Sequence, residues 1–243
     1  IDVLMWVGCA GSFDSRNQKI ARASATLYQK AGVKFAILGS EEKCTGDLAR
    51  RSGNEMLFQM LAGENVETMN NYKIKKIVTA CPHCLNSIKN EYPQLGGEYE
   101  VFHHSQFIAK LVDEGRLPVK SNLKDTITYH DPCYLGRYNK EYEAPRNLLK
   151  HAADEPMREM KRHGSESFCC GGGGARMWME EKIGTRINEN RTEEAISTGA
   201  STVATGCPFC MTMLSDGITA KGKSESMQVK DVAELVLEAV EAV

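Results

Sequence analysis

The stretch Ser167-Phe168-Cys169-Cys170-Gly171-Gly172-Gly173-Gly174 places two adjacent cysteines directly before four glycines. Neighbouring cysteines in an extended chain hold their side chains apart, so a disulfide between them is disfavoured. The two thiolates can instead bind different metal atoms of one polynuclear centre. The glycines let the backbone approach a bulky inorganic group and turn N–H groups toward its anionic sulfides. The stretch therefore predicts a metal-cluster site, and a buried cysteine pair before a flexible loop is the simpler alternative.

The composition sets limits on the class of protein. A chain of 243 residues can form one large or two small domains, and 42% hydrophobic with 26% charged residues is ordinary for a soluble protein. The net charge of −2 gives no electrostatic basis for nucleic-acid binding, and no nucleic acid is expected as a partner. No apolar run approaches the ~20 residues that span a bilayer. Because the chain starts with Ile1 in a strand-like run, we expect a fragment whose N-terminal region is missing.

Nine cysteines, an odd number, include two Cys-Pro-x-Cys motifs, at Cys81–Cys84 and Cys207–Cys210. Disulfide scaffolds are short, secreted and denser in cysteine. The count and spacing therefore indicate metal or redox chemistry.

Apolar runs of strand length alternate with segments of helical periodicity, which predicts an α/β fold of mostly parallel sheets flanked by helices. The expected strands cover residues 3–7, 33–38, 77–80, 99–102, 127–130, 159–161, 202–205 and 227–229. Helices are expected over residues 16–31, from after Asp47 to about 71, and over 105–114, 144–151, 176–198 and 231–241. Two further helices are expected directly after Cys84 and Cys210.

The cysteine spacing reveals an internal repeat. The pairs Cys44/Cys170, Cys81/Cys207 and Cys84/Cys210 are each separated by 126 residues, Cys9 and Cys133 by 124, and the closing segments match as Val101 against Met227. Such a period is too long for a solenoid and predicts two pseudo-symmetric domains, over residues 1–117 and 127–243, joined by a linker at 118–126. Lys43 stands where the second repeat has Cys169. The first repeat therefore offers four thiolates and the second offers five.

Most of the cysteines follow a predicted strand, and ligands of open α/β folds gather where parallel strands end. We therefore expect one site in the second repeat and another in the first. The second-repeat site is formed by Cys133, Cys169, Cys170, Cys207 and Cys210, and the first-repeat site by Cys9, Cys44, Cys81 and Cys84. Four thiolates suit a cubane cluster or a tetrahedral zinc, whereas five suggest a larger or unusual iron–sulfur cluster. A thioredoxin-like dithiol would use only two cysteines, and the first site has zinc or no metal as alternatives.

The pattern of a cysteine, then Cys-Cys-Gly, then Cys-Pro-x-Cys resembles the cysteine-rich, or CCG, domain. This domain is found twice in heterodisulfide reductase subunits B and D, glycolate oxidase iron–sulfur subunits, and anaerobic glycerol-3-phosphate dehydrogenase and lactate-utilisation subunits. The segments that carry the likeness are residues 6–12, 129–137 and 170–174, Trp-Val-Gly-Cys-Ala-Gly-Ser, Tyr-His-Asp-Pro-Cys-Tyr-Leu-Gly-Arg and Cys-Gly-Gly-Gly-Gly. They are most similar to the C-terminal part of membrane-bound iron–sulfur oxidoreductases.

That resemblance implies an electron-transfer domain of an anaerobic-type oxidoreductase. Its partners would be ferredoxin-like and cytochrome-b-like domains, electron-transfer flavoprotein and a quinone acceptor, at the cytoplasmic face of the membrane. The five second-repeat cysteines would hold a noncubane [4Fe–4S] cluster. The first-repeat four would hold a second [4Fe–4S] cluster or zinc, because Lys43 replaces the fifth ligand. Disulfide or heterodisulfide cleavage at the noncubane cluster is the alternative function, and a zinc-stabilised docking module is the second alternative.

Several residues near the cysteines are candidates for supporting roles. His83 is expected to hydrogen-bond beside a cluster, and His103-His104 to form a structural pair near the domain junction. His130-Asp131 is a candidate for proton relay. Other candidates are Arg137 and Arg176 for charge compensation, and Met177-Trp178-Met179 for packing.

Overall fold

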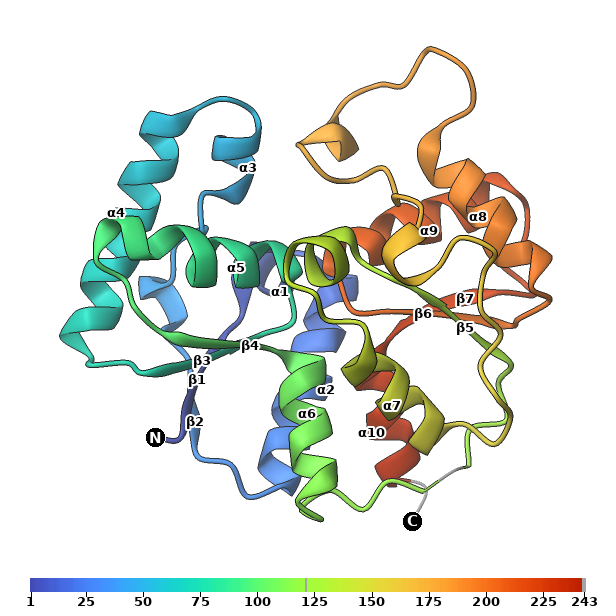
Figure 1. Cartoon of the computed structure of the whole chain (residues 1–243), viewed down its shortest axis with the longest axis horizontal. Helices are drawn as coiled ribbons and strands as arrows, with labels where there is room; N and C mark the ends of the chain where they lie inside the picture. Colours follow the sequence, from blue (N-terminus) through green and yellow to red (C-terminus); the bar gives the residue numbers. More distant parts are fainter. Residues whose placement is uncertain (121, 242–243) are drawn as a thin grey trace.

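The computed structural model describes residues 1–120 and 122–241 and contains two sheets, both entirely parallel (Figure 1). The first has the order β2-β1-β3-β4, formed by β1 (Val3–Trp6), β2 (Phe35–Ala36), β3 (Lys76–Thr79) and β4 (Glu100–His103). The second has the order β5-β6-β7, formed by β5 (Ile127–His130), β6 (Thr202–Thr205) and β7 (Gln228–Asp231). The predicted α/β class with parallel sheets and flanking helices is confirmed.

All four residues of β1, β5 and β6 are buried. Strands covered by helices on both faces need not alternate apolar and polar residues. β1 is the apolar run Val-Leu-Met-Trp, whereas β5 and β6 also bury polar side chains such as Thr128 and Thr205. The domain boundaries remain a prediction. Ser121, inside the predicted linker, and residues 242–243, at the end of the predicted second domain, lie outside the described residues.

One layer of four helices is shared by both sheets (Figure 1). It consists of α2 (Ser15–Lys30), α6 (His104–Asp113), α7 (Glu143–Ala152) and α10 (Val232–Glu241). Helix α2 packs on α10, and α6 packs on α7. Helices α2 and α7 follow equivalent strands of the two repeats, as do α6 and α10. The contact of α2 with α10 is therefore equivalent to the contact of α7 with α6. The halves are therefore related by a pseudo-twofold arrangement, and a single hydrophobic cluster joins them.

The opposite faces of the sheets carry the cysteines and a second buried cluster that also spans both halves. Its helices are α1 (Gly8–Phe13), α3 (Asp47–Arg51), α4 (Glu55–Asn71), α5 (Pro82–Asn86), α8 (Ile187–Ser197) and α9 (Pro208–Ala220). Pro82 and Pro208 begin α5 and α9. Proline suits this first position because the N–H that it lacks would have no partner within the helix.

The predicted strand at 159–161 is wrong. Among the described residues, one backbone hydrogen bond, from the Arg158 N–H to the Ile127 carbonyl at 2.8 Å, joins this region to β5. The next carbonyls are taken by side chains, because His163 Nδ1 donates to the Met160 oxygen and Arg191 donates to the Arg162 oxygen. The second sheet therefore lacks the partner that β2 provides in the first.

The predicted helix over 176–198 is confirmed only in its second part, α8 (Ile187–Ser197), whereas its first part has a 3-10 turn at Arg176–Trp178. Ala175 and Gly184 have left-handed φ angles of 63° and 68°, which a helix does not accept. Ile183 is 94% exposed, and Trp178 and Met179 are largely exposed. The expected packing occurs at Met177, which contacts the buried cluster that contains Cys170, and at Trp178, whose ring centroid lies 6.0 Å from that of Phe209. Met179 and Ile183 stay exposed, so packing gives no reason for a longer helix.

The closing strands match at an offset of 128, so the predicted match of Val101 with Met227 is wrong. Thr79 pairs with His103, whereas the equivalent Thr205 pairs with Asp231. His103 and Asp231 therefore occupy equivalent positions at the starts of α6 and α10. Their backbone N–H groups donate to Gln106 and Glu234, three residues on, so both helices begin with the same reciprocal cap.

These two helix starts meet in a fully buried polar network, which confirms the expected structural role of the histidine pair. His103 Nε2 donates to the Gly206 carbonyl at 3.0 Å, and His104 Nδ1 lies 3.2 Å from the same nitrogen. His104 Nε2 donates to Asp231 Oδ1 at 2.7 Å. Because Gly206 precedes Cys207, the network holds α6 of the first repeat against the second cysteine loop.

We expect His103 to make the protein sensitive to acid. Burial, with a further contribution from His104, holds the pKa of His103 well below its usual value. The unfolded chain binds a proton on this residue below about pH 6.5, whereas the folded chain does not. Stability should therefore fall as the pH drops below that value, by up to about 1.4 kcal/mol per pH unit relative to a His103→Gln variant. Urea denaturation between pH 7.5 and 5 measures the difference, and parallel curves would contradict it.

Candidate functional site

The second-repeat cysteines come from three loops at the carboxyl ends of the strands. Cys133 follows β5 and begins a π-helical turn over Tyr134–Tyr138, and Cys207 caps α9, with Cys210 in its first turn. Cys169 and Cys170 lie in the glycine-rich loop before α8. The Cys210 and Cys170 Sγ atoms are 3.3 Å apart, and none of the nine cysteines is in a disulfide.

Hydrogen bonds between thiols connect the five sulfurs into one group. Cys133 and Cys170 donate to Cys169 and lower its pKa to about 2, and the Gly171 N–H adds a bond of 3.2 Å. The same contacts raise the pKa of Cys133 and Cys170, and Cys210 contacts both Cys170 and Cys207. Crowded buried thiols of this kind can all be thiolates only when a cationic centre compensates their charge.

Steric constraints explain why glycines follow Cys170. Gly171 has a φ of +87°, and a Cβ on Gly172 would lie 3.0 Å from Met213 Cγ and 3.7 Å from Cys170 Sγ. A larger residue at Gly172 would therefore press against the sulfur site.

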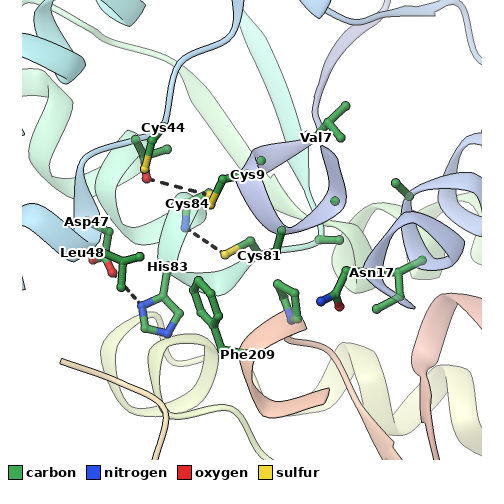
Figure 2. A pocket seen from close by; sticks show the side chains of 18 residues that line it. Val7, Cys9, Asn17, Cys44, Asp47, Leu48, Cys81, His83, Cys84 and Phe209 are labelled. Carbon is green, nitrogen blue, oxygen red and sulfur yellow. Dashed lines mark hydrogen bonds and ion pairs between the residues drawn. The ribbon is translucent and has the colours of Figure 1, made fainter. Parts of the chain in front are cut away.

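The first-repeat cysteines line a small cavity of about 30 Å³ (Figure 2). Cys9 lies in α1, Cys44 in the loop before α3, and Cys81 and Cys84 at the start of α5. Cys9 donates to Cys44, which lowers the pKa of Cys44 to about 6 and raises that of Cys9. Gly8 has a φ of +76°, and a Cβ there would lie 3.4 Å from Cys84 Sγ.

Lys43 does not take the place of a fifth thiolate, because the residue is exposed. Asn65 holds its backbone, accepting from the Lys43 N–H at 3.0 Å and donating to its carbonyl at 3.3 Å. The neighbouring Glu42, which the sequence did not single out, accepts from the Val7 and Gly8 N–H groups. Burial raises the pKa of Glu42 to about 7.

The sulfur atoms are close but not tightly packed. In the described part of the chain, no three cysteine Sγ atoms lie within 4.8 Å of one another, and the one such ligand group consists of His130, Cys170 and Cys210. A tetrahedral Zn²⁺ with Zn–S bonds of 2.3 Å requires sulfurs about 3.8 Å apart. Single pairs such as Cys170 and Cys210 are this close, but no three described cysteine sulfurs are, which suits a larger inorganic centre.

The middle residues of the two Cys-Pro-x-Cys motifs meet between the sites. The rings of His83 and Phe209 pack edge to face with their centroids 5.0 Å apart, and Phe209 also lines the first-repeat cavity. His83 Nδ1 lies 2.8 Å from Asp47 Oδ2, and its ring stacks on Tyr134. A hydrogen bond from His83 to a cluster stays a prediction. One ring contact therefore links the two cysteine groups (Figure 2).

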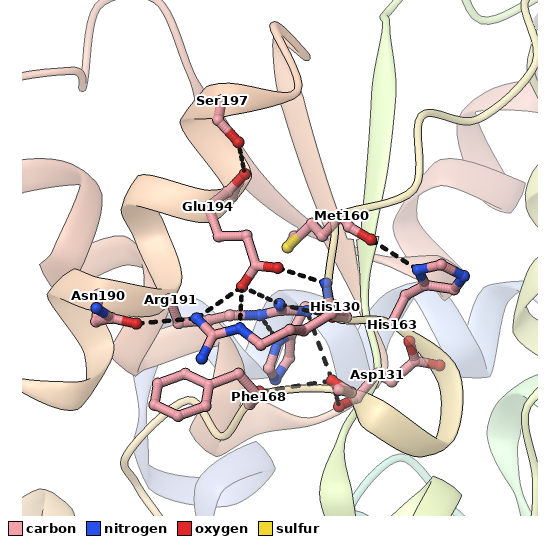
Figure 3. A network of polar contacts seen from close by, with 12 residues as sticks. His130, Asp131, Met160, His163, Phe168, Asn190, Arg191, Glu194 and Ser197 are labelled. Carbon is pink, nitrogen blue, oxygen red and sulfur yellow. Dashed lines mark hydrogen bonds and ion pairs between the residues drawn. The ribbon is translucent and has the colours of Figure 1, made fainter.

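Beside the second site, a fully buried Arg191 donates to His130 Nδ1 at 3.0 Å and to Glu194 at 2.9 Å (Figure 3). No pattern in the sequence pointed to Arg191, because a single arginine in a polar helix resembles a surface residue. Burial and this arginine lower the pKa of His130 to about 3, so its ring is neutral. Asp131 instead forms an ion pair with Arg146 at 2.6 Å, which gives it a structural role.

The two arginines predicted to compensate cluster charge behave differently. Arg137 donates to the Ser167 carbonyl and so fixes the loop that carries Cys169. Arg176 is half-exposed and lies 3.7 Å from Glu181. Only Arg137 is therefore tied to the cysteine loop.

Comparison with known proteins agrees with this geometry. The family model of the cysteine-rich domain, CCG, matches residues 3–89 and 127–215, one match in each repeat. The chain belongs to the cysteine-rich domain family. Each match of this domain contains all the cysteines of its repeat, and the predicted family is confirmed.

Curated relatives extend the likeness beyond the cysteines. The chain is 49% identical over 239 residues to the probable iron–sulfur-binding oxidoreductase FadF of Bacillus subtilis, and 47% identical over 247 residues to the EtfAB:quinone oxidoreductase of Syntrophomonas wolfei. These matches cover 98% and 99% of the chain but 34% of each relative. The chain is also 36% identical over 246 residues to one component of the dihydromethanophenazine:CoB–CoM heterodisulfide reductase of Methanosarcina barkeri, covering 98% of the chain and 59% of that component.

Among solved structures, a hypothetical protein from Helicobacter pylori superposes with a TM-score of 0.60 at 9% identity, covering 98% of this chain and 49% of that one. This likeness concerns the fold alone. Within the described residues, none of the helices combines the length and apolar character of a membrane span.

Proposed function

We propose that this cysteine-rich domain is an iron–sulfur electron-transfer domain of an oxidoreductase. The observation that carries the proposal is the convergence of nine thiols on two sites, in neither of which three described sulfurs lie within 4.8 Å of one another as a single tetrahedral ion would require. Iron–sulfur clusters are held by cysteine thiolates. The names of the relatives, an iron–sulfur-binding oxidoreductase and a quinone oxidoreductase, point the same way.

The two repeats differ in the centre they suit. Five connected thiols in the second repeat favour a noncubane [4Fe–4S] cluster, held by Cys133, Cys169, Cys170, Cys207 and Cys210. Four thiols around the first-repeat cavity favour a [4Fe–4S] cluster held by Cys9, Cys44, Cys81 and Cys84. When bound, such clusters supply one-electron redox chemistry. The protein holds them near each other, since the His83–Phe209 contact joins the two motifs.

The partners we propose are an electron-transfer flavoprotein on one side and a quinone on the other, as the name of the Syntrophomonas relative suggests. Because quinones are lipid-soluble, the domain would work at the cytoplasmic face of a membrane through redox subunits or further domains.

Anaerobic metal and sulfide analysis with EPR tests the assignment. We expect about eight irons and eight sulfides per chain, without zinc. A Cys169→Ser variant should keep its iron, because four thiolates remain as in the first repeat, but should change the EPR signal of the second centre. Zinc without sulfide would exclude electron transfer and favour a structural module.

Disulfide reduction is the second candidate, and the open cavity favours it. The pocket that the reductase hypothesis requires lies beside Cys9 and Cys44 rather than beside Cys169 and Cys170. Turnover of a disulfide substrate that is lost in a Cys9→Ser variant would support this hypothesis, whereas flavoprotein oxidation without any disulfide supports electron transfer.

A further inference from the structure

His130 lies within the second cysteine site without being one of its predicted ligands. One of its ring nitrogens and the Sγ atoms of Cys170 and Cys210 all lie within 4.8 Å of one another, and the residue is 1% exposed. Histidine in such a position can either bind the metal or donate a hydrogen bond to sulfur. Which of the two ring nitrogens carries the hydrogen decides between these roles.

Arg191 fixes that hydrogen. Its Nε donates to His130 Nδ1 at 3.0 Å, and a guanidinium has no acceptor atom. Nδ1 must therefore present its lone pair, so that the neutral ring carries its hydrogen on Nε2. Arg191 cannot turn away, because it is fully buried and its Nη1 donates to Glu194 and to the Arg162 carbonyl, both at 2.9 Å (Figure 3).

This arrangement is the reverse of that around a metal-binding histidine. A ligand histidine usually donates its second N–H to a carboxylate or carbonyl and binds the metal through the free lone pair. Here the second nitrogen accepts from a cation, and Nε2 has no lone pair to offer. His130 is thus a hydrogen-bond donor, and the sulfurs of Cys170 and Cys210 are the acceptors that the site provides.

The first repeat has a comparable donor at the equivalent position. Trp6 ends β1 three residues before Cys9, as His130 ends β5 three residues before Cys133. Trp6 is 1% exposed and belongs to the same buried cluster as Cys81 and Cys84. Among the residues that the structure describes, none accepts a hydrogen bond from its buried Nε1. An unmade bond of this kind costs about 1–3 kcal/mol, which indicates a missing acceptor.

We propose that the last residue of the first strand in each repeat, Trp6 or His130, donates a ring N–H to sulfur of that repeat's metal centre. The inference rests on the proposed iron–sulfur function. A donor to sulfur stabilises the reduced, more negative form of a cluster and raises its reduction potential. His130 and Trp6 are positioning and tuning residues rather than ligands.

Pulsed EPR on the iron-loaded protein carrying ¹⁵N-histidine tests His130 directly in the wild-type chain. We expect a weak nitrogen coupling to the reduced second centre and an exchangeable proton coupled to it. Strong coupling would mean that His130 binds the metal, and absent coupling would mean no contact, so either result overturns the proposal. Protein that binds no iron would contradict the proposed function itself.

Substitutions test the effect on potential. His130→Phe should abolish the weak coupling and lower the midpoint potential of the second centre only, and Trp6→Phe should lower that of the first only. The control is His163→Phe, because His163 is exposed and bonds only the Met160 carbonyl. Unchanged potentials in loaded His130→Phe and Trp6→Phe proteins would overturn the proposal. If either variant does not assemble its cluster, the wild-type coupling still decides for His130.

Discussion

A Cys210→Ser variant is expected to lose about half of the iron and sulfide, all of it from the second repeat. Cys210 is fully buried at the start of α9, its sulfur lies 3.3 Å from Cys170, and it also contacts Cys207. Unlike Cys169, Cys210 has an equivalent among the four cysteines of the first repeat, Cys84, so its removal leaves only three thiolates of that four-cysteine set. It also separates the Cys207 sulfur from that of Cys170, and a serine hydroxyl is a poor iron ligand because it is rarely ionised. Anaerobic iron and sulfide analysis with EPR measures the loss.

The matched variant is Cys84→Ser, which occupies the equivalent position in the first repeat and should remove the other half of the iron. The control is Ser215→Ala, one turn beyond Cys210 on α9, where the hydroxyl only bonds the Met211 carbonyl. Complete iron loss in either single variant would mean that the two sites do not assemble independently. Unchanged iron in Cys210→Ser would contradict its assignment as a ligand.

An Asp231→Ala variant should lose about 2–5 kcal/mol of unfolding free energy, because an unmade buried hydrogen bond costs about 1–3 kcal/mol and a lost helix cap about 0.5–2 kcal/mol. Asp231 and His104 are both fully buried, and Asp231 Oδ1 accepts from His104 at 2.7 Å and from the Ala233 N–H at 2.8 Å. The substitution therefore leaves a buried imidazole N–H and a helix N-terminus without their acceptor. Urea denaturation of the apo protein near pH 7.5 measures the change.

A surface pair nearby provides the control. Lys230 and Glu238 form an ion pair of 2.8 Å, but Glu238 is 45% exposed. Glu238→Ala should cost at most about 1 kcal/mol, because water and salt screen such a pair. Equal losses in the two variants would mean that the His103–His104–Asp231 network adds no more stability than a surface contact.

The chain order of elements was readable because strands such as β1 are buried without alternation of apolar and polar residues and are separated by segments of helical periodicity. The same reasoning failed at residues 159–161 and 176–186. At residues 159–161, Met160 is buried, but side chains take the carbonyls that a strand would use. In the later segment Ile183 is 94% exposed, so no burial stabilises a helix there. A local pattern indicates which side chains of a segment could be buried. Whether other parts of the chain pack over those side chains depends on the tertiary structure.

The sequence by itself determined the repeat, the parallel α/β class and the two groups of cysteines, because spacing and periodicity are local properties that every copy of the chain carries. Only the tertiary structure decided that α2, α6, α7 and α10 form one shared layer, that His83 meets Phe209, and that Arg191 sets the hydrogen of His130. Arg191 lies 61 positions after His130, and the contact of α2 with α10 brings together residues 218 positions apart. These contacts follow from how the two halves pack, which no local pattern of residues specifies.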